Sequence, residues 1–116
     1  MVKVNWDVEE LVALIDIYRK SDGKTVPQIN EELLGLSRAL NRRADILGIQ
    51  HDDKFRNLNG MKMMYQNVVY IATEGQHGMS STSIPMKKVY GLLERCPDVF
   101  ELILNEFRNR YCISTQ

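Results

Sequence analysis

The sequence predicts an all-α fold of about five helices in a compact single domain with a helix-turn-helix-like core. Hydrophobic residues recur every three or four positions along five segments, which is the spacing of one helix face. Capping residues, Pro or Gly separate these segments. The 116 residues are 44% hydrophobic and 26% charged, as in one globular domain. We therefore expect one domain over 1–116, with an ordered core at about 5–110.

The first helix is predicted over 8–20. Asp7 is a favourable N-cap, and Glu10 three residues later completes a capping box. Polar residues and a glycine at 21–23 end the segment. The hydrophobic residues between these signals have helical spacing: Leu11, Val12, Leu14, Ile15 and Tyr18.

The second helix is predicted from about Pro27, which suits a first helical turn, to 41 or 42. Residues 43–48 are long enough for one further turn, and 50–54 are typical of an exposed loop. The hydrophobic stripe of this helix consists of Ile29, Leu33, Leu36 and Leu40.

The third helix is predicted to begin at Asn59, a favourable N-cap. Lys62 and Gln66, with Asn67 beside them, are expected on its outer side. The β-branched stretch 68–71 could be a strand by propensity alone, but the cap and the preceding spacing favour a helix. The residues expected to face inward are Met61, Met64, Tyr65, Val68 and Ala72.

Two further helices are predicted after a loop at 74–82 that is rich in Gly and Ser. The fourth covers about 84–94, with Ser83 as its cap. The fifth covers about 98–109, after the break at Pro97, and the tail beyond it is expected to fray. Its expected buried residues are Val99, Phe100, Leu102, Ile103 and Phe107.

Several classes of function are excluded by what the sequence lacks. No hydrophobic run approaches the roughly 20 residues that span a bilayer, and the N-terminal residues lack the core of a signal peptide. We expect a cytoplasmic protein. His51, Asp52 and Asp53 are consecutive, so their side chains diverge rather than converge on a metal. No Ser or Cys is paired with a base, and no phosphate-binding loop is present. We therefore expect no catalytic activity, metal or cofactor.

The formal net charge is zero, but charge is unevenly distributed. Residues 1–37 have four basic and seven acidic side chains, 38–95 have nine and five, and 96–116 have two and three. An anionic partner is therefore expected to dock at the middle segment, although a solvated face explains the same pattern. Lys62 and Gln66 are candidates for contacts with base edges. The candidates for phosphate contacts are Arg42, Arg43, Lys54, Arg56 and Lys62.

A family resemblance adds to this interpretation. The run W-D-V-E-E-L from Trp6, with Tyr18, resembles the W-T-x-E-E-L…Y opening of a Myb/SANT-like domain at the N-terminus of predicted bacterial HNH restriction-type endonucleases. F-R-N-L-N-G-M at 55–61 resembles F-R-N-x-N-G-V of that family, and Asn67 falls at the asparagine of its K-L-x-N segment. More loosely, 78–100 is similar to the continuation of that domain.

The resemblance implies a non-catalytic, helix-turn-helix-like module that binds double-stranded DNA, in a restriction, defence or mobile-element system of a bacterium or phage. The HNH nuclease segment is missing, so nuclease activity is not carried over. Leu58 and Met64 depart from the usual proline and the frequent lysine of the family. The alternative is a protein-interaction or dimerisation module, such as a small phage or host regulator, which the neutral net charge and the methionines favour.

Overall fold

Five α-helices form the fold, and the described residues contain no strand, which confirms the predicted all-α class. The computed structural model describes residues 4–78 and 84–112. The helices are α1 (Val8–Arg19), α2 (Val26–Leu47), α3 (Leu58–Ala72), α4 (Ile84–Arg95) and α5 (Pro97–Tyr111). Residues 48–57 connect α2 to α3, a longer link than the roughly three or four residues of a helix-turn-helix, so the structure does not confirm such a core.

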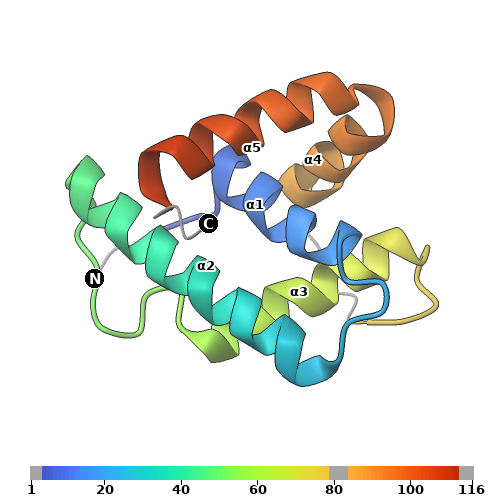
Figure 1. Ribbon diagram of the computed structural model, residues 1–116, viewed down its shortest axis with the longest axis horizontal. Helices are drawn as coiled ribbons and strands as arrows, with labels where there is room; N and C mark the ends of the chain where they lie inside the picture. Colours follow the sequence, from blue (N-terminus) through green and yellow to red (C-terminus); the bar gives the residue numbers. More distant parts are fainter. Residues whose placement is uncertain (1–3, 79–83, 113–116) are drawn as a thin grey trace.

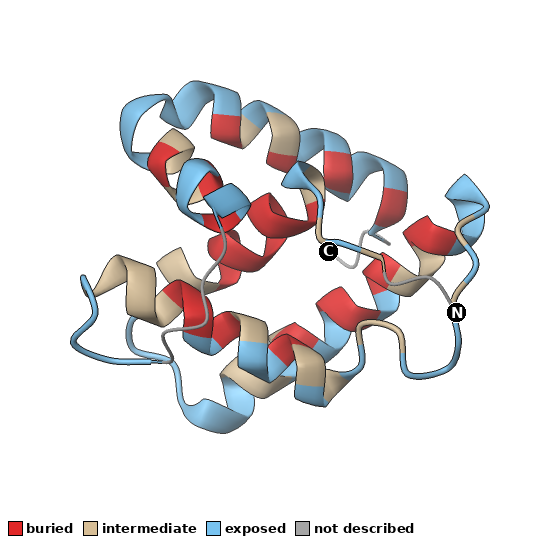
Figure 2. Ribbon diagram, turned by 180° about the vertical axis from the view of Figure 1, so that it is seen from behind, coloured by how far each residue is buried: buried red, intermediate tan, exposed pale blue. Residues whose placement is uncertain are grey.

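Helix α1 lies in the middle of the fold and packs against all four other helices. In Figure 1, α4 and α5 lie on one side of it, and α2 and α3 on the other. Figure 2 shows buried residues along α1 and on the sides of the other helices that face it. Every residue from Glu10 to Ile17 is buried, so α1 is enclosed on all sides rather than along one stripe.

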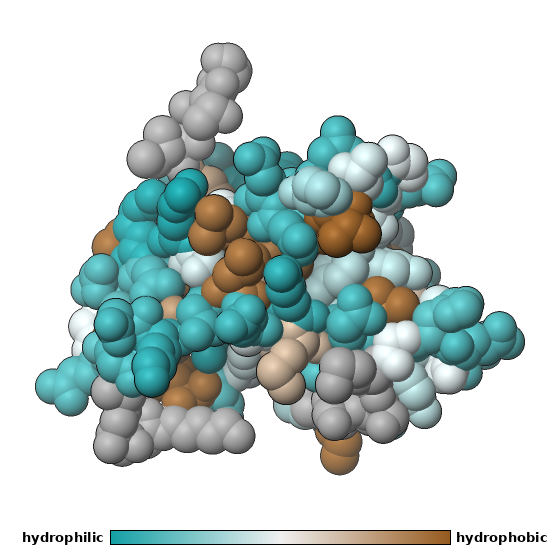
Figure 3. Space-filling view, turned by 90° about the horizontal axis from the view of Figure 1, so that it is seen from below, coloured by the Kyte–Doolittle hydropathy of each residue, from teal (hydrophilic) through white to brown (hydrophobic). Residues whose placement is uncertain are grey.

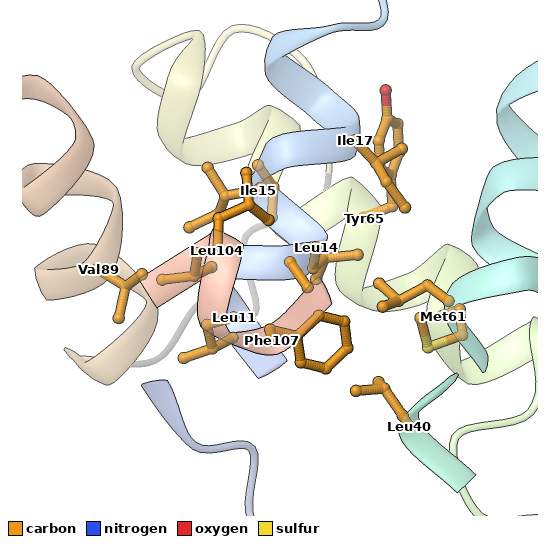
Figure 4. Packing of buried hydrophobic residues seen from close by; sticks show 14 of the residues in the cluster. Leu11, Leu14, Ile15, Ile17, Leu40, Met61, Tyr65, Val89, Leu104 and Phe107 are labelled. Carbon is orange, nitrogen blue, oxygen red and sulfur yellow. The ribbon is translucent and has the colours of Figure 1, made fainter. Parts of the chain in front are cut away.

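The core is built by side chains from all five helices, which point toward one another in Figure 4. Leu14 and Ile15 of α1 meet Met61 of α3 and Phe107 of α5 in one continuous cluster. The radius of gyration is 13.7 Å, close to the about 13 Å expected of a compact 100-residue domain.

The helix starts follow capping chemistry, and one differs from its prediction. The predicted capping box of α1 is present: Asp7 accepts from the Glu10 N–H at 3.0 Å, and Glu10 accepts from the Asp7 N–H at 3.1 Å. A second capping box, made by Thr25 and Gln28, starts α2 and was not predicted. Helix α3 starts two residues earlier than predicted, because the N-cap is Asn57, whose Oδ1 accepts from the Gly60 N–H at 2.9 Å.

Helix α2 extends past its predicted end, because Arg43 and Ala44 are buried and continue its inner face. It stops at Gly48, which has a φ of 73° in the left-handed region that favours glycine. The Ile49 N–H then donates to the Ala44 carbonyl at 2.8 Å, which closes the helix end.

Replacing Gly48 with alanine is expected to lower the free energy of unfolding by about 1–2 kcal/mol, the cost of a left-handed conformation. A Cβ at this position would meet no atom within 4 Å, so the backbone alone sets the cost. Gly35→Ala is the matched control, since a Cβ there also meets nothing. Within α2 that change should raise stability by about 0.5–1 kcal/mol. Equal effects of the two changes in urea denaturation would contradict the helix end at Gly48.

Helix α5 packs through only part of its predicted face: Phe100 and Phe107 are buried as predicted, and Ile103 is partly buried. Val99 and Leu102, expected in the core, are exposed, and Leu102 is 64% exposed. The buried residues are spaced by three and four: Phe100, Leu104, Phe107 and Tyr111. Tyr111 was expected in the fraying tail but is buried. The predicted cap of α4, Ser83, lies outside the described residues.

Among the described residues, none of the helices combines the length and the hydrophobicity that a membrane-spanning segment needs.

Candidate nucleic-acid interface and the adjoining cavity

The six residues predicted to contact DNA fall into two groups. Lys54, Lys62 and Gln66 are exposed. The three arginines of the set, by contrast, bind other parts of the protein, as described below: Arg42, Arg43 and Arg56.

Arg43 binds the first turn of α1. Its Nε donates to Glu9 Oε1 at 2.7 Å and its Nη2 to Asp7 Oδ2 at 2.6 Å. Its guanidinium also lies 5.7 Å from the ring centroid of Tyr111. Burial alone would lower the pKa of Arg43, but the hydrogen bonds and charges of the two carboxylates raise it above the usual value. The charge of Arg43 is therefore used inside the fold.

Arg56 forms a buried bidentate ion pair with Glu10, whose side chain is 2% exposed. The Arg56 Nε donates to Glu10 Oε2 at 2.9 Å, and Nη2 donates to Oε1 at 3.0 Å. The guanidinium lies 4.5 Å from the ring centroid of Trp6 and 4.4 Å from that of Phe55. It also donates to the Val4 carbonyl at 3.3 Å. One side chain thus joins the segment before α1 to the loop before α3.

The backbone of Arg56 is held in the left-handed region, with a φ of 49°. A non-glycine residue in this region costs on the order of 1–3 kcal/mol, and neighbouring contacts must hold it there. The ion pair with Glu10 supplies such a contact. The Ser37 hydroxyl supplies another, because it donates to the Arg56 carbonyl at 2.5 Å.

Arg42 is half-buried and reaches the last turn of α5, where its Nη1 donates to the Tyr111 carbonyl. A cation at a helix C-terminus is favoured by the helix dipole. Much of the mid-chain basic surplus is therefore matched within the molecule, by the acidic first turn of α1 and by the end of α5. Sequence reasoning missed this matching because the paired residues are far apart in the chain.

Lys54 and Lys62 form no ion pair with a described carboxylate. Lys62 and Gln66 are one turn apart on the exposed side of α3, as the sequence predicted. Lys54 lies in the loop before that helix, next to the exposed acidic residues Asp52 and Asp53. The two lysines are what remains of the predicted basic surface around α3.

A cavity of about 260 Å³ lies beside this surface. It is slightly smaller than the roughly 300 Å³ lower limit of drug-sized ligand pockets. One wall comes from Trp6, before α1, and the rest comes from α3 and the loop before it. The lining residues are Trp6, Lys54, Arg56, Asn57, Gly60, Met63, Met64 and Asn67.

Asn67 lines this cavity with an unsatisfied amide. The sequence placed Asn67 on the outer side of α3, but the residue is only 7% exposed. Among the described residues, its buried Oδ1 has no hydrogen-bond partner, and its Nδ2 has only the Met64 sulfur at 3.8 Å, a weak acceptor. An unsatisfied buried polar atom costs about 1–3 kcal/mol. A ligand group that bonds to this amide would remove that cost.

The N-terminus of α3 borders the same cavity, because Asn57 and Gly60 line it. Asn57 satisfies the N–H of Gly60, whereas the N–H groups of Leu58 and Asn59 have no described acceptor. Unpaired N–H groups and the helix dipole make this end of a helix attractive to anions.

His51, in the loop between α2 and α3, has hydrogen-bond partners close to it in the chain. His51 Nε2 lies 2.8 Å from Asp45 Oδ1, and Nδ1 lies 3.0 Å from the Asp52 carbonyl oxygen. The pKa of His51 is raised above its usual value of 6.5, mainly by the hydrogen bond to the Asp52 carbonyl and secondly by the hydrogen bond to Asp45. Within 4–78 and 84–112, no three His, Cys, Asp or Glu side chains are placed to hold a metal ion. Cys96 and Cys112 are free and exposed.

The sequence matches no known protein family, and no curated protein or solved structure is significantly similar to it. The resemblance to the N-terminal domain of HNH restriction-type endonucleases therefore stays a prediction.

Proposed function

We propose that this protein is a non-catalytic module that binds double-stranded DNA through the exposed side of α3 and the loop before it. The observation that carries the proposal is that Lys54 and Lys62 are exposed without an ion pair to a described carboxylate, beside the N–H groups of Leu58 and Asn59, which have no described acceptor. Lysines and helix N-termini are common phosphate contacts. Gln66, one turn beyond Lys62, is in position to contact a base edge.

The proposed interface is smaller than the one predicted from sequence. Arg42, Arg43 and Arg56 are left out as phosphate contacts, because each already binds a carbonyl or carboxylate within the protein. The biological setting, a cytoplasmic restriction, defence or mobile-element system, is part of the proposal and is supported by the resemblance alone.

Salt titration of duplex binding tests this interface. Each phosphate neutralised by a lysine adds about 0.9 to the slope of log affinity against log salt concentration. We expect a wild-type slope near −2, and Lys62→Gln should make it shallower by about 0.9 while weakening binding to all duplexes alike.

Arg110→Gln is the matched control, because it also removes one exposed positive charge. It lies on α5, on the other side of α1 from α3 (Figure 1). We expect this change to leave both affinity and slope unaltered. If the Lys62 and Arg110 variants behave alike, or if wild type shows no salt-dependent binding, the proposed interface is wrong.

A second candidate function, a protein-interaction or dimerisation module, is favoured by exposed hydrophobic side chains. Met63 on α3 is 58% exposed, and Ile46, Leu47 and Leu102 are exposed on α2 and α5. On the face seen in Figure 3, hydrophobic side chains gather in a small central group among mainly hydrophilic ones. Sedimentation velocity distinguishes the candidates, because a dimerisation module would associate with increasing concentration without DNA.

A further inference from the structure

The cavity beside α3 combines three features that suit one kind of ligand. Its lining includes Asn67, whose amide Oδ1 has no described hydrogen-bond partner. Trp6, Met63 and Met64 also line it. Lys54 lines it as well, together with Asn57 and Gly60 at the start of α3. A ligand that fits all three has a flat ring with a hydrogen-bonding edge and carries a negative charge.

We propose that this cavity binds a single nucleotide, with the edge of its base on Asn67 and its phosphate near Lys54. Asparagine amides recognise bases through a paired donor and acceptor, because Oδ1 accepts from one edge atom while Nδ2 donates to the next. Among the described residues, the buried Oδ1 of Asn67 has no partner and Nδ2 has only a sulfur, so neither atom is bound to a protein nitrogen or oxygen. A turn of the amide toward the cavity would bring both atoms to the edge of a base.

The walls suit the faces of a base. Bases stack on aromatic side chains, whatever their sequence, because every base has a π-face. Arg56 lies over one face of the Trp6 ring, so a base would stack on the other face. Methionine side chains are flexible and polarisable, so Met63 and Met64 can adapt to the opposite face. A cavity of about 260 Å³ is below the size of drug-sized pockets, which favours one ring system over a larger ligand.

The phosphate end has its own support. Lys54 lines the cavity and forms no ion pair with a described carboxylate. The N–H groups of Leu58 and Asn59, which follow the lining residue Asn57, have no described acceptor. Arg56 contributes to the wall but not to charge recognition, because Glu10 binds its guanidinium in bidentate geometry. Lys54 and the helix start are therefore the groups that meet the phosphate.

The nucleotide has two sources, a free mononucleotide or an unpaired base of DNA. Only the second rests on the proposed DNA binding. Trp6 is the only tryptophan of the chain and lines the cavity, so its fluorescence reports occupancy directly. The probes are adenosine monophosphate, ribose 5-phosphate, a fully paired duplex and the same duplex with one unpaired adenine.

We expect adenosine monophosphate or the duplex with an unpaired adenine to quench Trp6 saturably, and ribose 5-phosphate to have no such effect. Quenching by adenosine monophosphate shows that a free nucleotide is sufficient to occupy the cavity. Quenching only by the duplex with an unpaired adenine identifies DNA as the source of the nucleotide. Either result supports base recognition. No quenching by either probe, or equal effects of adenosine monophosphate and ribose 5-phosphate, overturns the proposal.

Asn67→Leu removes the amide but keeps a similar volume. The affinity for the ligand that quenches Trp6 should fall by roughly tenfold to a hundredfold, the loss expected when a buried hydrogen-bonding partner is removed. The variant should fold at least as well as wild type, since it removes an unsatisfied polar group. Circular dichroism and thermal melting check this point. Unchanged affinity in the folded variant would overturn the role of Asn67.

Lys62→Gln is the matched control, because Lys62 is exposed on α3 but does not line the cavity. It should weaken binding of fully paired DNA and leave the quenching of Trp6 by adenosine monophosphate unaltered. Asn67→Leu, by contrast, should weaken the quenching of Trp6 and leave the binding of fully paired DNA unaltered. The two proposals can therefore fail separately. If wild type shows no salt-dependent binding of paired DNA but its Trp6 is quenched by adenosine monophosphate, the DNA interface is rejected. If wild type binds paired DNA but neither nucleotide probe quenches Trp6, the cavity proposal is rejected.

Discussion

Replacing Glu10 with alanine is expected to lower the free energy of unfolding by about 3–5 kcal/mol. The change leaves the Arg56 guanidinium buried against Trp6 and Phe55 without its counter-charge. It also removes the side chain that accepts from the Asp7 N–H in the α1 capping box. Since domains of this size are stable by about 5–15 kcal/mol, the loss is large, and urea denaturation followed by circular dichroism measures it.

The control for Glu10 is Glu106→Ala, the same substitution at an exposed ion pair. Glu106 and Arg110 are both largely solvent-accessible, and their carboxylate and guanidinium are 3.3 Å apart. We expect a loss of about 0–1 kcal/mol there. A double replacement of Glu10 and Arg56 by leucine should be less harmful than Glu10→Ala, because no unpaired charge remains. Similar small losses at Glu10 and Glu106 would show that the pair is not buried in solution.

Replacing Phe107 with alanine should cost about 3–5 kcal/mol, the usual effect of truncating a buried phenylalanine. Phe107 is 1% exposed and belongs to the central cluster, with its ring centroid 5.5 Å from that of Tyr111. Truncation leaves a cavity between α5 and α1 that neighbouring side chains fill only partly. Thermal and urea denaturation should both report the loss.

Leu102→Ala, on the same helix, is the control for Phe107. The sequence placed both residues in the core, but the structure exposes Leu102, so its truncation should change stability by less than about 0.5 kcal/mol. The pair of variants therefore measures which face of α5 packs inward. Equal losses at the two positions would contradict the observed face.

Local chemistry explains why most helices could be predicted. The capping box of α1 is encoded within four residues, and the periodic stripe of α2 needs no knowledge of its neighbours. The start of α3 was misplaced because Asn57 and Asn59 are equally good caps in sequence. The left-handed turn at Arg56 makes Asn57 the cap, and a distant ion pair helps to hold that turn.

The candidate site was less predictable, because its features depend on contacts between distant segments. Lys62 and Gln66 are exposed as their helical spacing indicated. Arg43 and Arg56, however, were assigned to a surface because an arginine in sequence carries no sign of a buried acidic partner. Asn67 was placed outside for a similar reason, since a polar residue left unsatisfied in the interior has no sequence signature.

The central place of α1 bears on how the chain can be divided. Each of the other helices covers part of this one segment, so a fragment starting after it would leave four inner surfaces bare to water. Neither the α2–α3 pair nor the α4–α5 pair would keep a closed interior by itself. The molecule should therefore melt as one cooperative unit, with the amides of α1 among the slowest to exchange with solvent.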